Sequence, residues 1–208
     1  MANKTADLSV QARSGAKRRR ATQADILSAT RRLILAGESI TALSMDRIAR
    51  EADVSRATVY LHFQDKTEVM ARLADDIVEQ RFALGAELLA DPHIGRDVLD
   101  RIVAEMVQRW VDDAPLLDAI IEFAERDPEM RRIWVTAIHE VGALGADLMR
   151  DRWADNASAY DDPDTMGQVL AWMFERATHQ LTREPERREE VTRAIAEVVW
   201  RVFDYRPA

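Results

Sequence analysis

The sequence predicts an all-α protein of about nine helices, with a short N-terminal part and a longer C-terminal part. Hydrophobic residues make up 47% of the 208 residues, and the chain holds seven Gly and six Pro. This composition provides a substantial core and few turns. Hydrophobic side chains recur every three or four residues, which is typical of amphipathic helices. No segment shows sustained alternation of polar and apolar residues, so we expect no β-sheet.

Residues 1–20 are expected to form a flexible, basic N-terminal arm, because they lack hydrophobic periodicity. The arm ends in four consecutive cations: Lys17, Arg18, Arg19 and Arg20. The first helix is predicted to begin at Thr22, where the following residues are typical of a capping box. Gly37 follows the last periodic residue and is expected to end this helix in a left-handed conformation.

Residues 44–63 carry the pattern of two short helices joined by a tight turn. Ser44 and Ser55 each precede a helical segment, and a serine hydroxyl there accepts hydrogen bonds from backbone N–H groups of the first turn. Both segments have an apolar stripe, whereas the outward face of the second helix is polar or slim. Such a helix fits a DNA major groove and reaches the phosphates on both sides. This helix-turn-helix makes binding of double-stranded DNA the leading hypothesis.

The rest of the chain is predicted to be a series of amphipathic helices. Asp65 is expected to cap a long fourth helix that continues to about residue 89, before a break at Asp91-Pro92. Further helices are expected over 95–111, 116–125, 128–153, 163–182 and 187–204. The expected domains are the arm over 1–20, a helix-turn-helix domain over 21–66 and a helical domain over 67–208.

Charge is divided unevenly between the predicted domains. The whole chain has a formal net charge of −8, which by itself argues against a DNA-binding protein. Residues 1–66, however, hold 12 Lys and Arg against 7 Asp and Glu, while residues 67–208 hold 17 against 30. Phosphate binding depends on the field within about a Debye length, roughly 8 Å at physiological salt. The basic charge therefore lies where the helix-turn-helix requires it.

Composition and motifs argue against several other classes of protein. The chain has no Cys, which excludes disulfides and thiolate metal sites, and no apolar run approaches the length of a transmembrane helix. The N-terminus lacks an apolar stretch, so we expect a cytoplasmic, nucleoid-associated protein rather than a secreted one. His139-Glu140 lacks the second His of a zinc-protease motif, and no nucleophile elbow occurs. We therefore predict no catalytic activity, no metal and no cofactor.

The first four helices resemble the TetR family of bacterial transcriptional regulators over about residues 20–80. The resemblance rests on the motifs Ile48-Ala49-x-x-Ala52-x-Val54-Ser55 and Thr58-Val59-Tyr60-x-His62-Phe63-x-x-Lys66. Asp53 replaces the glycine that this family usually has in the turn. Asp tolerates a left-handed conformation better than most residues, so the turn is expected to survive.

The resemblance implies roles at the DNA for particular residues. Arg56 and Thr58 would face base edges, while Tyr60 would have a buried ring and a hydroxyl on a phosphate. The basic arm, with Arg18, Arg19 and Arg20, would lie along the minor groove. Further contacts to the DNA are implied for Thr22, Ser44, Ser55, His62 and Lys66.

The C-terminal part resembles, over shorter motifs, the actinobacterial regulators of ethionamide sensitivity. These motifs are Arg132-Ile133-Trp134, Met173-Phe174-Glu175-Arg176 and Val198-Val199-Trp200. Those relatives hold an elongated, largely apolar ligand in a tunnel, and the tunnel asparagines fall on Ala171 and Phe174 here. The resemblance therefore implies a less polar pocket, with core packing as the alternative for each apolar residue. We expect the pocket to be lined by Met106, Trp110, Phe123, Trp134, Ile138, Ala171, Phe174 and Glu175.

The last two predicted helices carry more apolar surface than one small domain must cover, and the TetR family uses them as a dimer interface. The residues expected there are Met166, Val169, Leu170, Val191, Ile195, Val198 and Val202. We therefore predict a homodimeric repressor that binds a pseudo-palindromic operator and is released by a small, mainly apolar ligand. The alternatives are a DNA-bound structural or cell-cycle protein that needs no ligand, and an enzyme with a DNA-binding appendage.

Overall fold

The computed structural model describes residues 2–77, 95–153 and 162–203 of the chain. Within these ranges the regular secondary structure is helical, as the sequence predicts. The chain divides into two compact units, Met1–Leu73 and Ala74–Ala208. No helix in the described ranges is both long enough and apolar enough to cross a membrane.

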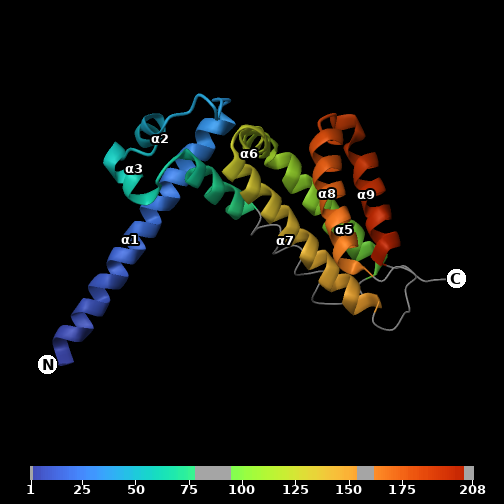
Figure 1. Ribbon diagram of the computed structural model, residues 1–208, viewed down its shortest axis with the longest axis horizontal. Coiled ribbons are helices and arrows are strands. Elements are labelled where there is room, and N and C mark those ends of the chain that lie inside the picture. The colour runs from blue at the N-terminus through green and yellow to red at the C-terminus, as the bar shows by residue number, and fades with distance from the viewer. Residues whose placement is uncertain (1, 78–94, 154–161, 204–208) are drawn as a thin grey trace. The chain divides into compact units, whose positions relative to one another are not determined.

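The first unit is built from the helices α1 (Ala2–Leu35), α2 (Met45–Glu51) and α3 (Arg56–His62), followed by helical residues 66–77 that continue into the second unit. Figure 1 shows α2 and α3 beside the C-terminal half of α1. Buried side chains from each helix form the core, among them Ile26, Leu33, Ile48, Val59 and Phe63. Because the apolar side of α3 is used in this core, its polar side remains at the surface.

Two residues with positive φ angles form the turns of this unit. Gly37 has a φ of 88° and ends α1 as predicted, and the Glu38 N–H donates to the Leu33 carbonyl oxygen at 3.0 Å. This bond takes up a carbonyl that the end of the helix leaves free. Asp53, between α2 and α3, has a φ of 54°. The expectation that Asp replaces the usual glycine in a left-handed turn is confirmed.

The N-terminal segment differs from the prediction. Residues 2–21 belong to α1, which begins at Ala2, so the predicted start of the first helix at Thr22 is wrong. Thr22 lies inside α1 and donates its hydroxyl to the Arg18 carbonyl oxygen at 3.1 Å instead of capping a helix. The physical reason is composition: this segment is rich in Ala and Arg, which favour helix, and contains no Pro.

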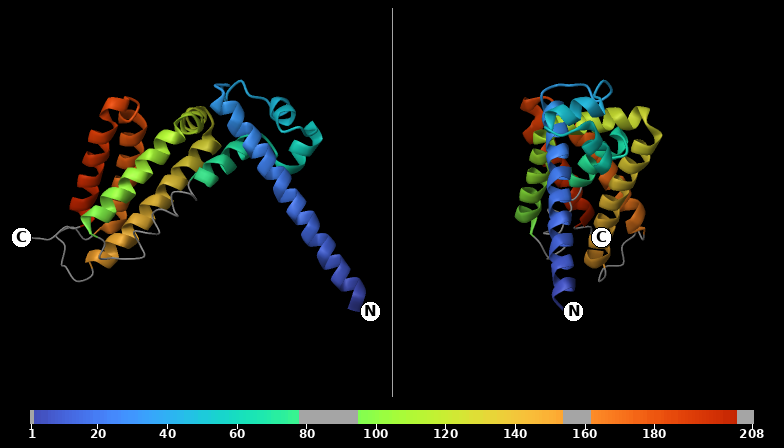
Figure 2. Two further views of the ribbon diagram at one scale, coloured as in Figure 1. Left: turned by 180° about the vertical axis from the view of Figure 1, so that it is seen from behind. Right: turned by 90° about the vertical axis from the view of Figure 1, so that its left-hand side faces the viewer.

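The second unit consists of α5 (Arg96–Asp112), α6 (Ala114–Arg126), α7 (Pro128–Trp153), α8 (Pro163–Leu181), the short 3₁₀ helix η1 (Pro185–Arg187) and α9 (Arg188–Phe203). These bounds agree closely with the five predicted segments. The predicted end of the fourth helix, near residue 89, lies outside the described residues. Helix α7 packs along α8 and α6, and α5 packs along α9. Figure 2 shows this bundle from two further sides.

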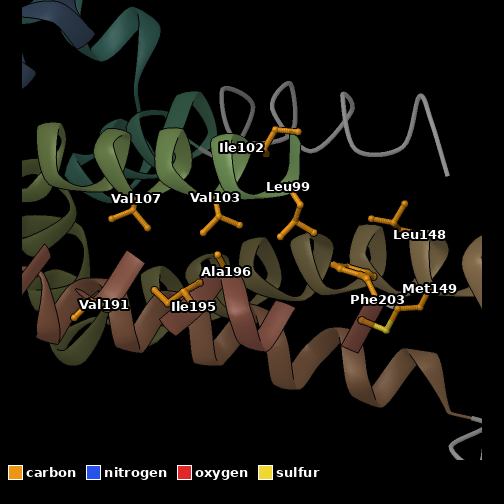
Figure 3. Close-up of a cluster of buried hydrophobic side chains, with 10 residues drawn as sticks. All are labelled: Leu99, Ile102, Val103, Val107, Leu148, Met149, Val191, Ile195, Ala196 and Phe203. Carbon is orange, nitrogen blue, oxygen red and sulfur yellow. The ribbon is translucent and has the colours of Figure 1, made fainter. Parts of the chain in front are cut away.

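The core of the second unit lies between α5, α7 and α9, as Figure 3 shows. Leu99, Val103 and Val107 project from α5 toward Ile195 and Ala196 of α9. The whole buried cluster is Leu99, Ile102, Val103, Val107, Leu148, Met149, Val191, Ile195, Ala196 and Phe203. The last helix is therefore held to the bundle by its own apolar stripe.

Candidate nucleic-acid interface and ligand cavity

The turn between α2 and α3 is fixed by local hydrogen bonds. The Ser44 hydroxyl accepts the Arg47 N–H at 3.2 Å, and the Ser55 hydroxyl accepts the Thr58 N–H at 3.0 Å. The prediction that these serines cap the two helices is confirmed. Each cap satisfies a backbone N–H in the first turn of its helix. Hydrogen bonds between neighbouring residues therefore fix where α2 and α3 begin.

On α3, Arg56 and Tyr60 are exposed and lie about one helical turn apart, whereas Thr58 is partly buried. Tyr60 is 43% exposed, and the Arg56 guanidinium lies over its ring, 5.4 Å from the centroid. The expectation of a buried Tyr60 ring is therefore wrong, because Val59 and Phe63 occupy the core side of α3 instead. Arg56 also pairs with Asp46 of α2 at 3.1 Å. The Arg56 guanidinium and the Tyr60 ring thus share one exposed face of α3.

A contact between two hydroxyls and an ion pair orient the side chains of Thr58 and Arg56. The hydroxyls of Thr58 and Ser55 are 2.8 Å apart, so Thr58 is held toward the N-terminus of α3. The Arg56–Asp46 pair is largely exposed, and exposed pairs contribute little to stability. Arg56 can therefore exchange its partner Asp46 for an anion that it binds more strongly, such as a phosphate.

His62 and Lys66 follow the exposed face and are partly buried. The Lys66 ammonium donates to the carbonyl oxygens of Ile40 at 2.8 Å and Thr41 at 3.3 Å. Burial lowers the pKa of Lys66. Burial and the nearby charge of Arg19 lower the pKa of His62. Lys66 therefore fastens the segment before α2, a role that the sequence analysis missed because no local spacing indicates it.

The basic segment of α1 lies near the end of α3. Arg18, Arg19 and Arg20 are exposed, and the charge of Arg19 acts on His62. These two segments are more than forty residues apart in the chain. The fold thus brings one cation of the predicted arm, Arg19, near the end of the predicted recognition helix.

A network of ion pairs also supports α2, although the sequence analysis did not single it out. Arg47 bonds to Glu38 at 2.8 Å and to Glu51 at 3.1 Å, and Arg32 of α1 reaches Glu51 at 3.3 Å. The hydrogen bond from Arg47 is the main cause that lowers the pKa of Glu51. The spacing of Arg47 and Glu51 signals one of these pairs, whereas the others depend on the fold.

The residues expected to line an apolar pocket are mostly buried in the second unit. Trp110, Phe123, Trp134, Ile138, Ala171 and Glu175 are each at most 9% exposed. Met106 and Phe174 are partly buried against the core cluster. The structure brings Trp110 and Phe174 into an edge-to-face contact with ring centroids 6.3 Å apart.

A cavity of about 320 Å³ is lined by Trp110, which belongs to this predicted set, and by residues that the sequence analysis did not name. We call it the α8-end cavity, because its polar residues come mainly from the end of α8 and the segment that follows. Its lining is Trp110, Val111, Ala114, Asp118, His179, Thr182, Arg183 and Arg188. The spacing of His179 and Arg183 places both on one helix face, but no sequence signal joins them to Asp118.

Glu175 is the buried acidic group of the predicted pocket. It is 1% exposed, and neither carboxylate oxygen makes a hydrogen bond to the described residues. Arg176 lies 3.6 Å from one oxygen. Burial raises the pKa of Glu175, and the charge of Arg176 opposes this in part. A neighbouring hydroxyl on the same helix face, that of Thr178, is also buried without a hydrogen bond.

The predicted dimer residues divide into two groups. Val191 and Ile195 are 5% and 4% exposed within a single chain, so they offer little surface to a second copy. Both residues belong to the α5–α7–α9 core of the single chain. Val169 and Val198 are 55% and 41% exposed, and Met166, Leu170 and Val202 are partly buried against the core.

Comparisons with known proteins agree with this architecture. Residues 26–73 match the family described as bacterial regulatory proteins, tetR family. The nucleoid occlusion factor SlmA of Aliivibrio fischeri (strain MJ11) is 28% identical over 109 residues, which are 52% of this chain. Those residues are 48% of SlmA, so the chain spans about half the length of the curated relatives that it matches.

Solved structures share the fold at low sequence identity. Salmonella enterica GusR has a TM-score of 0.70 at 17% identity, covering 88% of this chain and 95% of its own. The TetR family transcriptional regulator PfmR from Thermus thermophilus has a TM-score of 0.62 at 20% identity, covering 85% and 97%. The resemblance thus extends through the C-terminal helices, beyond the matched N-terminal residues.

Proposed function

We propose that the chain is a DNA-binding transcriptional regulator that acts as a homodimeric repressor. The match of residues 26–73 to the tetR-family model supports this proposal, as does the fold that the chain shares with a solved TetR family regulator. In this proposal it binds a pseudo-palindromic operator on the nucleoid and is released by a small, mainly apolar ligand. The observation that carries the proposal is the capped α2–α3 turn, with Arg56 and Tyr60 exposed on α3 and Thr58 partly exposed at its start.

The DNA contacts are assigned from the chemistry of that face. A helix of seven residues such as α3 presents few side chains to a major groove, so base readout falls to Arg56 and Thr58. Tyr60 and the exposed Arg18, Arg19 and Arg20 supply phosphate contacts, which set affinity rather than sequence preference. Ser44 and Ser55 act through the helices that they cap, and His62 packs at the end of α3.

A symmetric dimer follows from the small number of base contacts. One α3 reads few base pairs, whereas two related copies on a pseudo-palindrome multiply the affinity. The exposed apolar residues of α8 and α9, Val169 and Val198, supply surface for such a contact. Next to Val169, a shallow surface groove on α8 includes Gln168 and Trp172. Contacts of this kind on both copies would make the interface isologous.

Release by a ligand requires two conformations of the dimer. A ligand shifts their balance by its differential affinity for the two states. In the released state the spacing of the two α3 helices would no longer match successive major grooves. The aromatic residues of the second unit, among them the buried Trp110 and the partly buried Phe174, favour a largely apolar ligand.

The similarity to a nucleoid occlusion factor favours a second candidate. In that case the chain is a DNA-bound structural or cell-cycle protein on the same fold, and no ligand releases it. Occupancy at many dispersed chromosomal sites, with no melting shift from any apolar compound, would support this candidate over a ligand-released repressor.

Selection of sites from random DNA tests the proposed function. We expect the full-length protein to enrich one two-fold symmetric site, because two α3 helices would contact two half-sites about one helical turn apart. Sedimentation of the complex should then give two chains, or a multiple of two, per site. Enrichment of an asymmetric site that is bound by one chain would refute the homodimeric repressor.

A further inference from the structure

The α8-end cavity combines an apolar floor with a cationic rim. Trp110, Val111 and Ala114 form the apolar side, and Trp110 is 3% exposed. The polar side carries two guanidinium groups, those of Arg183 and Arg188, and one carboxylate, that of Asp118. A volume of about 320 Å³ lies at the lower end of the range for small-molecule sites. The cavity therefore fits a compact molecule with one polar end.

The two arginines are held in the same way. Arg183 donates its Nε–H to the His179 carbonyl oxygen at 3.1 Å, and Arg188 donates its Nε–H to the Thr182 carbonyl oxygen at 3.0 Å. Both bonds use carbonyls at the end of α8, where helix carbonyls lack partners within the helix. Each guanidinium is thus oriented by the hydrogen bond from its Nε, and its two terminal nitrogens are left for other partners. Such fixed forks match the geometry of a carboxylate.

The two guanidinium groups differ in their acidic partners. Arg183 pairs with Asp118 at 2.8 Å and approaches the His179 ring at 3.2 Å. Arg188, in contrast, has no carboxylate partner among the described residues, and its terminal nitrogens make no hydrogen bond within those ranges. The cavity is therefore lined by one paired cation and one unpaired cation.

The remaining titratable group facing the cavity is His179, which is 9% exposed. Burial is the main cause that lowers the pKa of His179, while Asp118 opposes it. His179 is therefore neutral at neutral pH and adds no charge to the rim. With two cations against one carboxylate, a single negative charge on a ligand balances the cavity, whereas a dianion meets repulsion from Asp118.

We propose that the α8-end cavity is the effector site and that it binds a monocarboxylate with a compact apolar body, whose carboxylate pairs with Arg188 and whose body lies against Trp110. This inference rests on the proposed function, because it gives the ligand of the repressor its chemical class. It refines the mainly apolar ligand by adding one anionic end. Arg183 supplies the second cation, and Asp118 selects against dianions.

Calorimetry with 3-phenylpropanoate tests the site on the full-length protein in the absence of DNA. The uncharged analogue 3-phenylpropan-1-ol has the same apolar body, and phenyl phosphate supplies a dianion at slightly alkaline pH. We expect 3-phenylpropanoate to bind at least tenfold more tightly than either analogue. Equal affinity for acid and alcohol would overturn the assignment of the cationic rim.

Two substitutions and a matched control locate the carboxylate. Arg188→Gln should weaken binding of 3-phenylpropanoate at least tenfold, while Arg187→Gln, which changes charge equally on an exposed neighbour outside the cavity, should leave it unchanged. Asp118→Asn should tighten binding, because it removes the repelling carboxylate. Equal losses in both arginine variants, or weaker binding in Asp118→Asn, would contradict the proposal. Melting temperatures of the unliganded variants separate these effects from loss of fold.

Fluorescence anisotropy on a selected operator separates this inference from the proposed function. We expect 3-phenylpropanoate to release the wild-type protein and to require at least tenfold higher concentration for Arg188→Gln. Intact operator binding without any effect of the acid would overturn the effector site and leave the DNA-binding function in place. Binding of the acid by a protein that enriches no operator would overturn the proposed function and the effector role, while the cavity itself would stand.

Discussion

The two units of this protein differ in how fully their polar groups are hydrogen-bonded. In the first unit, the turn that presents α3 is closed by paired groups, with Ser44 and Ser55 each accepting a backbone N–H. Among the described residues, one buried side-chain atom of the first unit lacks a hydrogen bond, His62 Nδ1, whereas in the second unit such atoms gather on α8, at Gln168, Glu175 and Thr178. An unsatisfied buried polar group lowers stability. The turn before α3 is therefore held in one geometry by its caps, whereas α8 retains several groups that gain from new partners.

This difference fits a division of labour between a rigid reading surface and an adaptable body. A recognition helix requires a fixed orientation, since its few side chains must reach base edges in register. A helix that reports a ligand requires two arrangements of similar free energy. We assign these two arrangements to α8, because its buried polar groups lack hydrogen bonds to the described residues.

The largest expected effect comes from truncating a buried side chain in the core of one unit while the core of the other is left intact. Ile48→Ala should lower the free energy of unfolding of the first unit by about 2–5 kcal/mol, the range for truncation of a buried Ile, because Ile48 is fully buried. DNA binding should be lost with it. Hydrogen exchange should show reduced protection in α2 and α3 and unchanged protection in α5 and α9.

Ile195→Ala is the matched variant in the second unit, where Ile195 is 4% exposed. It should reduce the protection of α5 and α9 and spare α2 and α3. If either variant lowered protection throughout the chain, the separation into two units with distinct cores would be wrong.

The first unit could be predicted from the sequence to a greater extent than the second. The caps at Ser44 and Ser55 and the left-handed Asp53 depend on neighbouring residues, so local patterns found them. Thr22 was placed wrongly because a capping pattern also occurs inside a continuous helix, where its hydroxyl bonds to a backbone carbonyl instead. Local signals therefore set the ends of short helices better than the start of a long one.

The second unit shows why sites built by distant segments escape sequence analysis. Helical periodicity located α5 to α9, but periodicity marks a residue as buried without naming its partner. Val191 and Ile195 are therefore expected at a dimer interface, while the single chain already buries them in its own core. Likewise, Asp118 and Arg183 meet across sixty-five residues of sequence, and no local spacing indicates that contact.

A smaller effect should come from removing the buried charge on α8. Glu175→Gln should raise the free energy of unfolding by about 1–3 kcal/mol at pH 7, because an unsatisfied buried group is destabilising and a charged one more so. Burial raises the pKa of Glu175 in the folded state. The penalty therefore applies above the ordinary glutamate pKa and disappears as the pH falls below it.

Denaturant unfolding of wild type and variant between pH 7 and pH 4 measures this effect. The gain from Glu175→Gln should shrink as the pH falls, and Glu129→Gln, at an exposed position of α7, should show no such trend. A destabilised Glu175→Gln at pH 7 would indicate that the carboxylate has a favourable partner, and the contrast between the two units would weaken.

The central claim is that α3 reads DNA bases through Thr58 and holds phosphates through Tyr60. Anisotropy titrations on a panel of single-base operator variants test it most directly, with wild type, Thr58→Ala and Tyr60→Phe compared at one salt concentration. Because base contacts set preference and phosphate contacts set affinity, Thr58→Ala should change the order of affinities across the panel. Tyr60→Phe should lower every affinity by a similar factor. An unchanged order in Thr58→Ala, with its fold intact by circular dichroism, would contradict the account.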